Sequence, residues 1–148
     1  GVDGVIISCC GDPGLELVRE DLSIPVVGAG ESTALMSLRY GEKIYSLGIT
    51  ETAPKNYKKV LKERLIDNAI PEGVYSTLDL QDVQGWNSVC EKAKQLKENG
   101  AEVIALACTG MATMGIAPKL EEVIGISVLD PVMCEGLVMY MELLRKNS

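Results

Sequence analysis

Short apolar runs alternate with longer amphipathic stretches along this chain. The runs are rich in Val and Ile and are bounded by turn-forming residues, which is typical of buried parallel strands. The pattern predicts strands at 5–8, 24–27, 43–49, 74–78, 103–107 and 126–129. It predicts helices at 15–21, 31–39, 55–68, 86–98, 118–123 and 133–145. Strands that alternate with helices favour an α/β fold with parallel sheets.

The signals at helix ends support this division. Asp12 followed by Pro13 predicts the start of helix 15–21, with the Asp12 side chain as its cap rather than as a catalytic acid. Asn99 and Gly100 close the helix 86–98, as expected for residues that tolerate a left-handed backbone.

The sequence also contains an internal repeat. Residues 1–11 and 100–110 each carry a glycine and an acidic residue, then an apolar run, and end in Cys-x-Gly. Residues 22–28 and 124–130 match each other as a second short apolar run before a predicted helix. We therefore expect two pseudo-symmetric parallel-sheet α/β halves with the site in the cleft between them. Residues 1–40 plus 130–148 would belong to the first domain and residues 41–129 would form the second.

Two cysteines occupy equivalent places in this repeat. Cys9 and Cys108 each follow a predicted strand, and ligands of open α/β sheets bind beyond the carboxyl ends of the strands. If the halves face each other, the two thiols lie on opposite sides of a bound molecule. One thiolate could then remove a proton from carbon while the other thiol returns one to the opposite face. This chemistry inverts a stereocentre and needs no cofactor.

Residues around the two cysteines could bind the substrate. Backbone N–H groups in the turns after the cysteines could stabilise a developing oxyanion, and they belong to Cys10, Gly11, Thr109 and Gly110. Thr50, which closes a strand, could either cap the next helix or line the cleft. Met111 is most simply a core residue, although it could also touch the substrate.

Composition restricts the chemistry further. The chain has no histidine, which excludes His-based triads and imidazole bases. Its five cysteines have no C-x-x-C spacing, so neither a metal site nor a disulfide framework is expected, and free thiols fit a cytoplasmic protein. The formal net charge of −7 disfavours nucleic acid and anionic membranes as partners. No apolar run reaches the roughly 20 residues of a membrane span.

The two cysteine motifs resemble those of the aspartate/glutamate/hydantoin racemase superfamily, and of hydantoin racemases most closely. The segments that carry the resemblance run over nearly the whole chain: Ile7 to Leu15, Ile24 to Gly28 with Glu31, Ala107 to Met111, and Val128 to Asp130. The resemblance implies two pseudo-symmetric α/β domains, the first completed by the C-terminal helix. It also implies that Cys9 and Cys108 are the acid and base, with no metal and no pyridoxal cofactor.

The chain departs from the family pattern at two places. Cys10 stands where hydantoin racemases commonly have an aromatic residue. The family also begins with a strand-helix-strand stretch containing an Asn-Pro motif, and no counterpart of it precedes Val5. We therefore expect the first half to be incomplete and the chain to start within a larger protein, so that the fragment alone could lack activity.

These observations favour a cofactor-independent racemase or epimerase acting on 5-substituted hydantoins. An aspartate/glutamate-type amino-acid racemase or related isomerase is the alternative within the same class, although no Arg or Lys is obviously placed to receive a free carboxylate. A non-catalytic small-molecule binding domain is the alternative from another class, and a thiol redox role for Cys9 and Cys10 is a minor third. The expected partners are a small-molecule substrate and further copies of the same chain.

Overall fold

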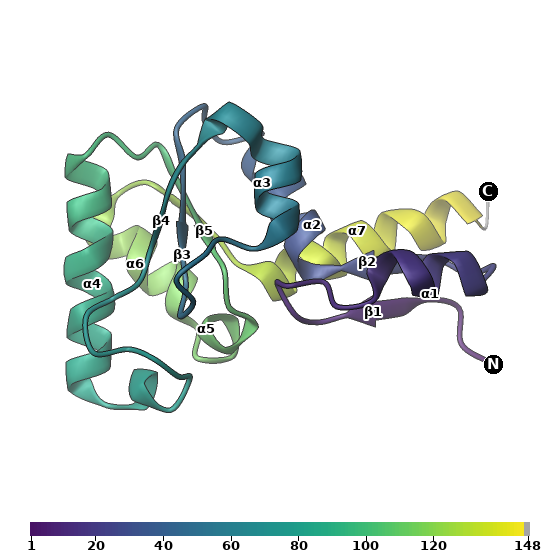
Figure 1. Ribbon diagram of the computed structural model, residues 1–148, viewed down its shortest axis with the longest axis horizontal. Helices are drawn as coiled ribbons and strands as arrows, with labels where there is room; N and C mark the ends of the chain where they lie inside the picture. The colour runs from purple at the N-terminus through teal and green to yellow at the C-terminus, as the bar shows by residue number, and fades with distance from the viewer. Residues whose placement is uncertain (147–148) are drawn as a thin grey trace.

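The computed structural model describes residues 1–146, which contain two parallel β-sheets (Figure 1). In the smaller sheet, β1 (Val5–Ile7) pairs with β2 (Val26–Gly28). The larger sheet has the strand order β4-β3-β5-β6, formed by Leu65–Ala69, Ile44–Leu47, Val103–Leu106 and Ser127–Leu129. All pairings are parallel, which confirms the predicted α/β class.

Helices cover both faces of the four-stranded sheet, because its two central strands, β3 and β5, are buried along their whole length. Along β5, Ile104 and Leu106 pack into one core, while Val103 and Ala105 pack into the other. The first core is completed by α4 (Val83–Glu98) and α6 (Ile116–Ile124). The second is completed by residues of α2 (Ala29–Ser37) and α3 (Lys55–Leu61). Continuous apolar strands of this kind are expected where a parallel sheet is buried between helical layers.

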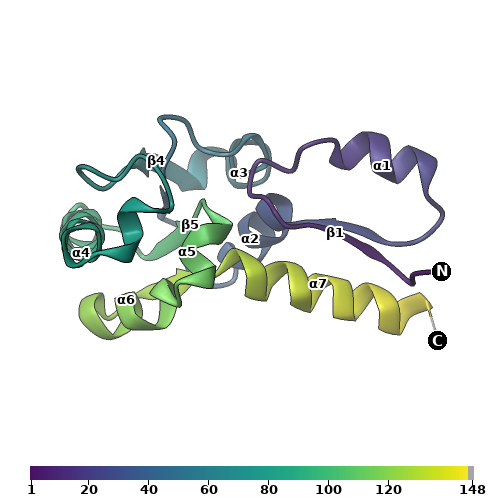
Figure 2. The same ribbon diagram turned by 90° about the horizontal axis from the view of Figure 1, so that it is seen from below.

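The C-terminal helix connects the two sheets. In Figure 2, α7 (Pro131–Lys146) runs from the four-stranded sheet along the small sheet, with β1 between it and α1 (Leu15–Asp21). The N-terminus and the last described turn of α7 lie at the same end of the molecule (Figure 1). No helix within residues 1–146 is long and apolar enough to cross a membrane.

Two predicted elements were wrong. The helix predicted at 55–68 ends at Leu61, where Lys62 takes a left-handed backbone with φ of 51°, and residues 65–69 form strand β4 instead. The strand predicted at 74–78 is irregular, although Val74 is buried in the core. The reason is tertiary: Leu65–Ala69 pairs with β3 at the edge of the sheet, and this pairing outweighs the helical spacing of its apolar residues.

Candidate active site

The two cysteine turns lie at corresponding strand ends. β1 ends at Ile7 and β5 ends at Leu106, and each cysteine follows two residues later. The turns are close in space, because the Thr109 hydroxyl donates a hydrogen bond to the Ser8 carbonyl at 3.5 Å. The fold thus brings together Cys9 and Cys108, which are 99 positions apart in the sequence.

Both cysteines line one pocket of about 510 Å³, which we call the cleft pocket. Its residues come from the two cysteine turns, from the loop between β3 and α3, and from the first turns of α3: Cys9, Cys10, Gly11, Ile49, Thr50, Thr52, Ala53, Pro54, Lys55, Lys58, Ala107, Cys108 and Thr109. A pocket of this size suits a small-molecule ligand. Thr50 lies in its wall, and the Thr50 carbonyl accepts a hydrogen bond from Asn68 Nδ2 at 3.0 Å.

Two of the sequence-predicted site residues do not line this pocket. Met111 is fully buried in the core beside α4 and α6, so its side chain packs and does not face the cleft. Gly110 lies behind Cys108, where a Cβ atom would collide with the Thr77 side chain. Glycine at this position lets the segment around Thr77 approach the second cysteine turn closely.

The two vicinal cysteines have different surroundings. Cys9 is exposed, whereas Cys10 is 3% exposed and its Sγ lies 3.8 Å from the Leu106 carbonyl oxygen. Burial raises the pKa of the Cys10 thiol far above its ordinary value, and the nearby Cys108 and Cys9 add to this effect. The Cys10 thiol therefore stays protonated, and its side chain is a core residue.

Replacing Cys10 with alanine should leave the chemistry of the cleft nearly intact. The variant removes a small buried side chain, so we expect a loss of stability of about 1 kcal/mol and a change in activity of less than about threefold. Alkylation by iodoacetamide at pH 8 gives the second readout: it should be as fast in Cys10→Ala as in wild type. Much slower alkylation would show that Cys10 is the reactive thiol.

Asp12 holds the first cysteine turn in place, and its predicted role was wrong in part. It does not cap α1, whose first residue follows Gly14. Its buried carboxylate instead accepts hydrogen bonds at the start of α2, from Gly30 N at 2.9 Å and Glu31 N at 2.7 Å, and from Asn56 Nδ2 at 2.6 Å. Asp12 is thus a helix cap supplied from a distant part of the sequence.

Sequence reasoning missed Gly30 as a contributor to the site. A Cβ atom at this position would overlap the carbonyl group of Cys10, so only glycine lets the cysteine turn pack on the start of α2. The Gly28-Ala29-Gly30 sequence at the start of α2 was the signal that could have indicated such a close approach.

A buried carboxyl lies next to the first cysteine turn. Glu135 of α7 is 4% exposed and accepts a hydrogen bond from the Ser8 hydroxyl at 2.7 Å through Oε1. Its Oε2 has no hydrogen-bond partner among the described residues. Burial raises the pKa of the Glu135 carboxyl; the hydrogen bond from Ser8 opposes this effect, while the nearby Asp12 and Asp130 carboxylates add to it.

This carboxyl should make stability depend on pH. A raised pKa in the folded state means that the unfolded chain loses its proton first, so stability is full below about pH 4.3 and falls as pH rises through the raised value. Glu135→Gln removes this loss. At pH 8 we expect its free energy of unfolding, measured with urea, to exceed that of wild type by about 1 kcal/mol. The difference should shrink towards pH 4. A difference that grows on acidification would contradict this assignment.

Within residues 1–146 no group of three or more His, Cys, Asp or Glu side chains is placed to hold a metal ion. The cleft pocket is lined by residues of the two cysteine turns, including Cys9 and Cys108, and by Lys55 and Lys58 of α3. Fold and site together define a parallel α/β protein of two sheets with a pair of cysteines in one pocket.

The chain belongs to the Asp/Glu/hydantoin racemase family, whose sequence model matches residues 1–135. It is 30% identical over 136 residues to a hydantoin racemase of Paenarthrobacter aurescens, an alignment that covers 88% of this chain and 57% of the relative. The chain thus spans little more than half the length of this curated relative.

Solved structures show the same fold. An allantoin racemase from Klebsiella pneumoniae is similar with a TM-score of 0.77 and 27% identity, over 95% of this chain and 59% of that one. A glutamate racemase isoform from Bacillus anthracis is similar with a TM-score of 0.69 and 18% identity, over 98% of this chain and 59% of that one. These likenesses confirm the predicted Asp/Glu racemase-like fold.

Proposed function

We propose that the protein is a cofactor-independent racemase in which Cys9 and Cys108 form an acid–base pair. The observation that carries this proposal is that both cysteines line one pocket, each two residues beyond the end of a parallel strand. Membership of a family named for racemases supports it. Cysteine suits the task because its ordinary pKa of about 8.5 allows a thiolate and a thiol to coexist near neutral pH.

In the proposed reaction, the substrate carbon lies between the two sulfur atoms. One thiolate takes the proton from the carbon next to a carbonyl group, and the electron pair moves onto the carbonyl oxygen as an enolate. The other thiol then gives its proton to the opposite face of the carbon, which inverts the centre. Backbone N–H groups of the pocket-lining turn residues Cys10, Gly11 and Thr109 are the candidate donors to the enolate oxygen.

The preferred substrate class in this proposal is a 5-substituted hydantoin. Relatives that align over most of this chain are named as hydantoin racemases, and a structural neighbour as an allantoin racemase. In these rings the proton to be removed lies on a carbon next to a carbonyl. An aspartate/glutamate-type racemase remains the second candidate. Its substrate has a free carboxylate, and Lys55 and Lys58, which line the cleft pocket, could bind that group.

The remaining features belong to the same proposal. We propose that residues 1–40 plus 130–148 form one domain and residues 41–129 the other, a division supported by the two separate sheets.

We also propose a cytoplasmic, homo-oligomeric protein. Five free cysteines support the cytoplasmic location. The apolar side chains that α7 exposes, among them Met133, Leu137 and Tyr140, support contact with further copies of the chain.

The test is the loss of optical rotation of a single-enantiomer 5-alkylhydantoin in the presence of the full-length protein, with L-aspartate and L-glutamate as parallel substrates. We expect racemisation of the hydantoin above the spontaneous rate, measured with heat-inactivated protein. If none of the three loses rotation while the hydantoin still binds, the non-catalytic binding domain is the better account.

A further inference from the structure

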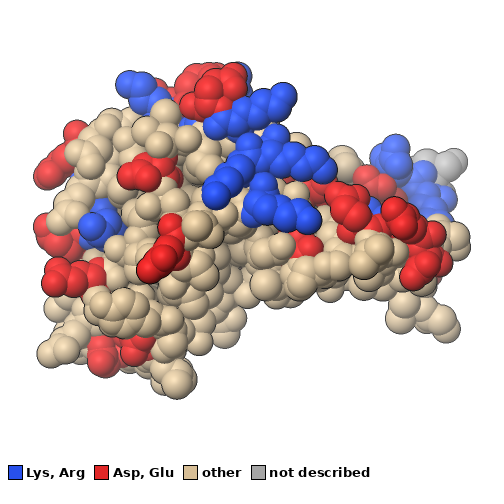
Figure 3. Space-filling model, viewed as in Figure 1, with Lys and Arg blue, Asp and Glu red and all other residues tan. Residues whose placement is uncertain are grey.

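The charged residues of the cleft pocket are all of one sign. Of the described residues that line it, Lys55 and Lys58 are the only ones with a Lys, Arg, Asp or Glu side chain. This is unexpected in a protein whose formal net charge is −7. Figure 3 shows the Lys and Arg side chains gathered over α3, the helix that carries both of these lysines.

Neither ammonium group is neutralised by a carboxylate in the part of the chain that the structure describes. Within residues 1–146 neither Lys55 nor Lys58 has a carboxylate oxygen within 4.0 Å of its nitrogen. The neighbouring Lys59 on the same helix pairs with Glu16 at 3.5 Å and does not line the pocket. The two cleft lysines are thus available to an anion from solution, whereas Lys59 already has a partner.

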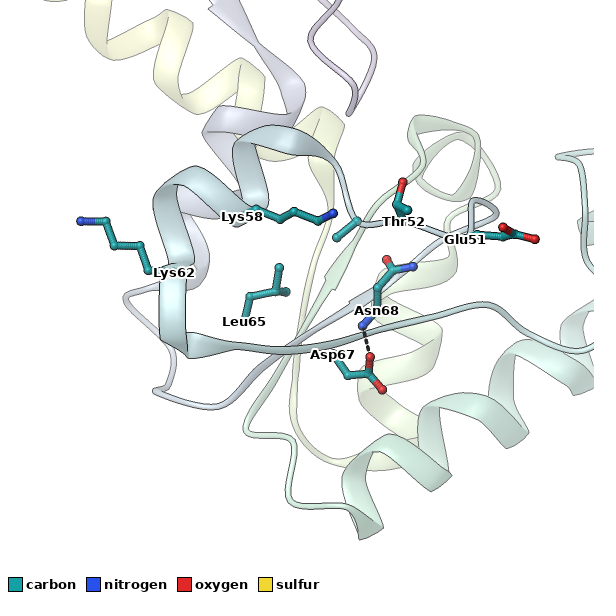
Figure 4. Close-up of a pocket in the computed structure, with 8 residues that line it drawn as sticks. Glu51, Thr52, Lys58, Lys62, Leu65, Asp67 and Asn68 are labelled. Atoms are coloured by element: carbon teal, nitrogen blue, oxygen red, sulfur yellow. Dashed lines mark hydrogen bonds between the residues drawn. The ribbon is translucent and has the colours of Figure 1, made fainter.

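The direction of one lysine side chain supports this reading. In Figure 4, Lys58 extends from α3 towards Thr52, a residue of the loop that also lines the cleft pocket, whereas Lys62 extends away from that loop. Glu51 and Asp67 lie in the adjoining pocket that Lys58 shares, yet Lys58 forms an ion pair with neither of them. The exposed Lys58 side chain therefore lies beside the cleft pocket, with no ion pair to any carboxylate of residues 1–146.

We propose that Lys55 and Lys58 form a subsite that selects carbon acids whose substituent ends in a carboxylate. This inference rests on the proposed function and names its substrate class: the reacting carbon lies between Cys9 and Cys108, and the anionic end of the substituent lies against α3. A neutral substituent of the same shape fills the same space and gains nothing from the two charges.

The expected discrimination is moderate because both lysines are exposed. Exposed ion pairs are individually weak and are screened by salt, so two lysines together should favour the anionic substrate by roughly tenfold. The preference should weaken as the salt concentration rises, whereas the rate with the neutral substrate should not change.

The experiment compares 5-carboxymethylhydantoin with its isosteric carboxamide, as single enantiomers, with the full-length protein. The first readout is kcat/KM for exchange of the C5 proton of the hydantoin ring with solvent deuterium. The second is the protection of the cysteines from iodoacetamide by each compound. The variants are Lys55→Met/Lys58→Met and, as a matched control on the same helix, Lys59→Met. We expect wild type to favour the carboxylate by roughly tenfold, the double variant to lose this preference, and Lys59→Met to keep it.

Other outcomes overturn the inference in distinguishable ways. Equal rates with the two compounds in wild type would show that no carboxylate subsite exists. An equal loss for both compounds in the double variant would show that the lysines act on the thiols or the enolate instead. If neither compound is exchanged, the proposed function fails; the protection assay then still decides whether the pocket prefers the carboxylate.

Discussion

Cys9→Ala and Cys108→Ala should each lower kcat/KM for racemisation by about 10³-fold or more. A positioned acid or base typically contributes about 10²–10⁴-fold, and inversion needs both groups in one turnover. The two cysteines follow strands of different sheets but line the same pocket, so we expect that neither can substitute for the other. Optical rotation of a 5-alkylhydantoin, followed for both enantiomers, measures the loss.

The matched control is Cys90→Ala. Cys90 lies on α4, where it packs against the core and does not line the cleft pocket, so its removal should leave the rate within about threefold of wild type. Each single active-site variant retains one thiol and should still exchange the proton of one enantiomer only. Full racemisation by either variant would contradict the assignment of the pair.

Asp12→Ala should lower the free energy of unfolding by about 3–5 kcal/mol. The carboxylate is 2% exposed and accepts three hydrogen bonds, which hold the first cysteine turn to α2 and α3. Its removal leaves two buried donors, Gly30 N and Asn56 Nδ2, and one part-buried donor, Glu31 N, without this acceptor, and such donors are costly. Urea unfolding at pH 7 measures the change, and activity should fall with it because Cys9 lies in the same turn.

Glu16→Ala removes an acidic side chain from the same region and serves as control. Glu16 is exposed and pairs with Lys59 at 3.5 Å, so its loss should change stability by about 0.5 kcal/mol or less. If Asp12→Ala were as stable as Glu16→Ala, the buried carboxylate would not be what holds the turn.

Local pattern predicted most of the fold. The parallel α/β class followed from apolar runs such as 103–107, and the helix at 15–21 begins and ends where it was predicted. The segment 65–69 could not be assigned in this way, because its apolar residues fit a helix and only pairing with β3 makes it a strand. Val74 shows the reverse case, since its burial reflects packing of an irregular loop into the core.

The site was predictable where the repeat marked it and not elsewhere. The equivalence of Cys9 and Cys108 was visible in the sequence, and the structure places both in one pocket. The hydrogen bonds of Asp12 to α2 and of Glu135 to Ser8 join segments 18 or more positions apart, so no local pattern reports them. The same holds for Lys55 and Lys58, which line the cleft pocket because α3 packs beside it.

The most direct test of the two-base account is the position of the label in the first turnovers in heavy water. The full-length protein would be given one enantiomer of a 5-alkylhydantoin. The two enantiomers would be separated before a tenth of the substrate has reacted. Thiols on opposite faces predict that the newly formed enantiomer carries solvent deuterium while the recovered substrate keeps its proton. Product that retains the original proton would mean that a single group carries it across, which contradicts the paired roles of Cys9 and Cys108.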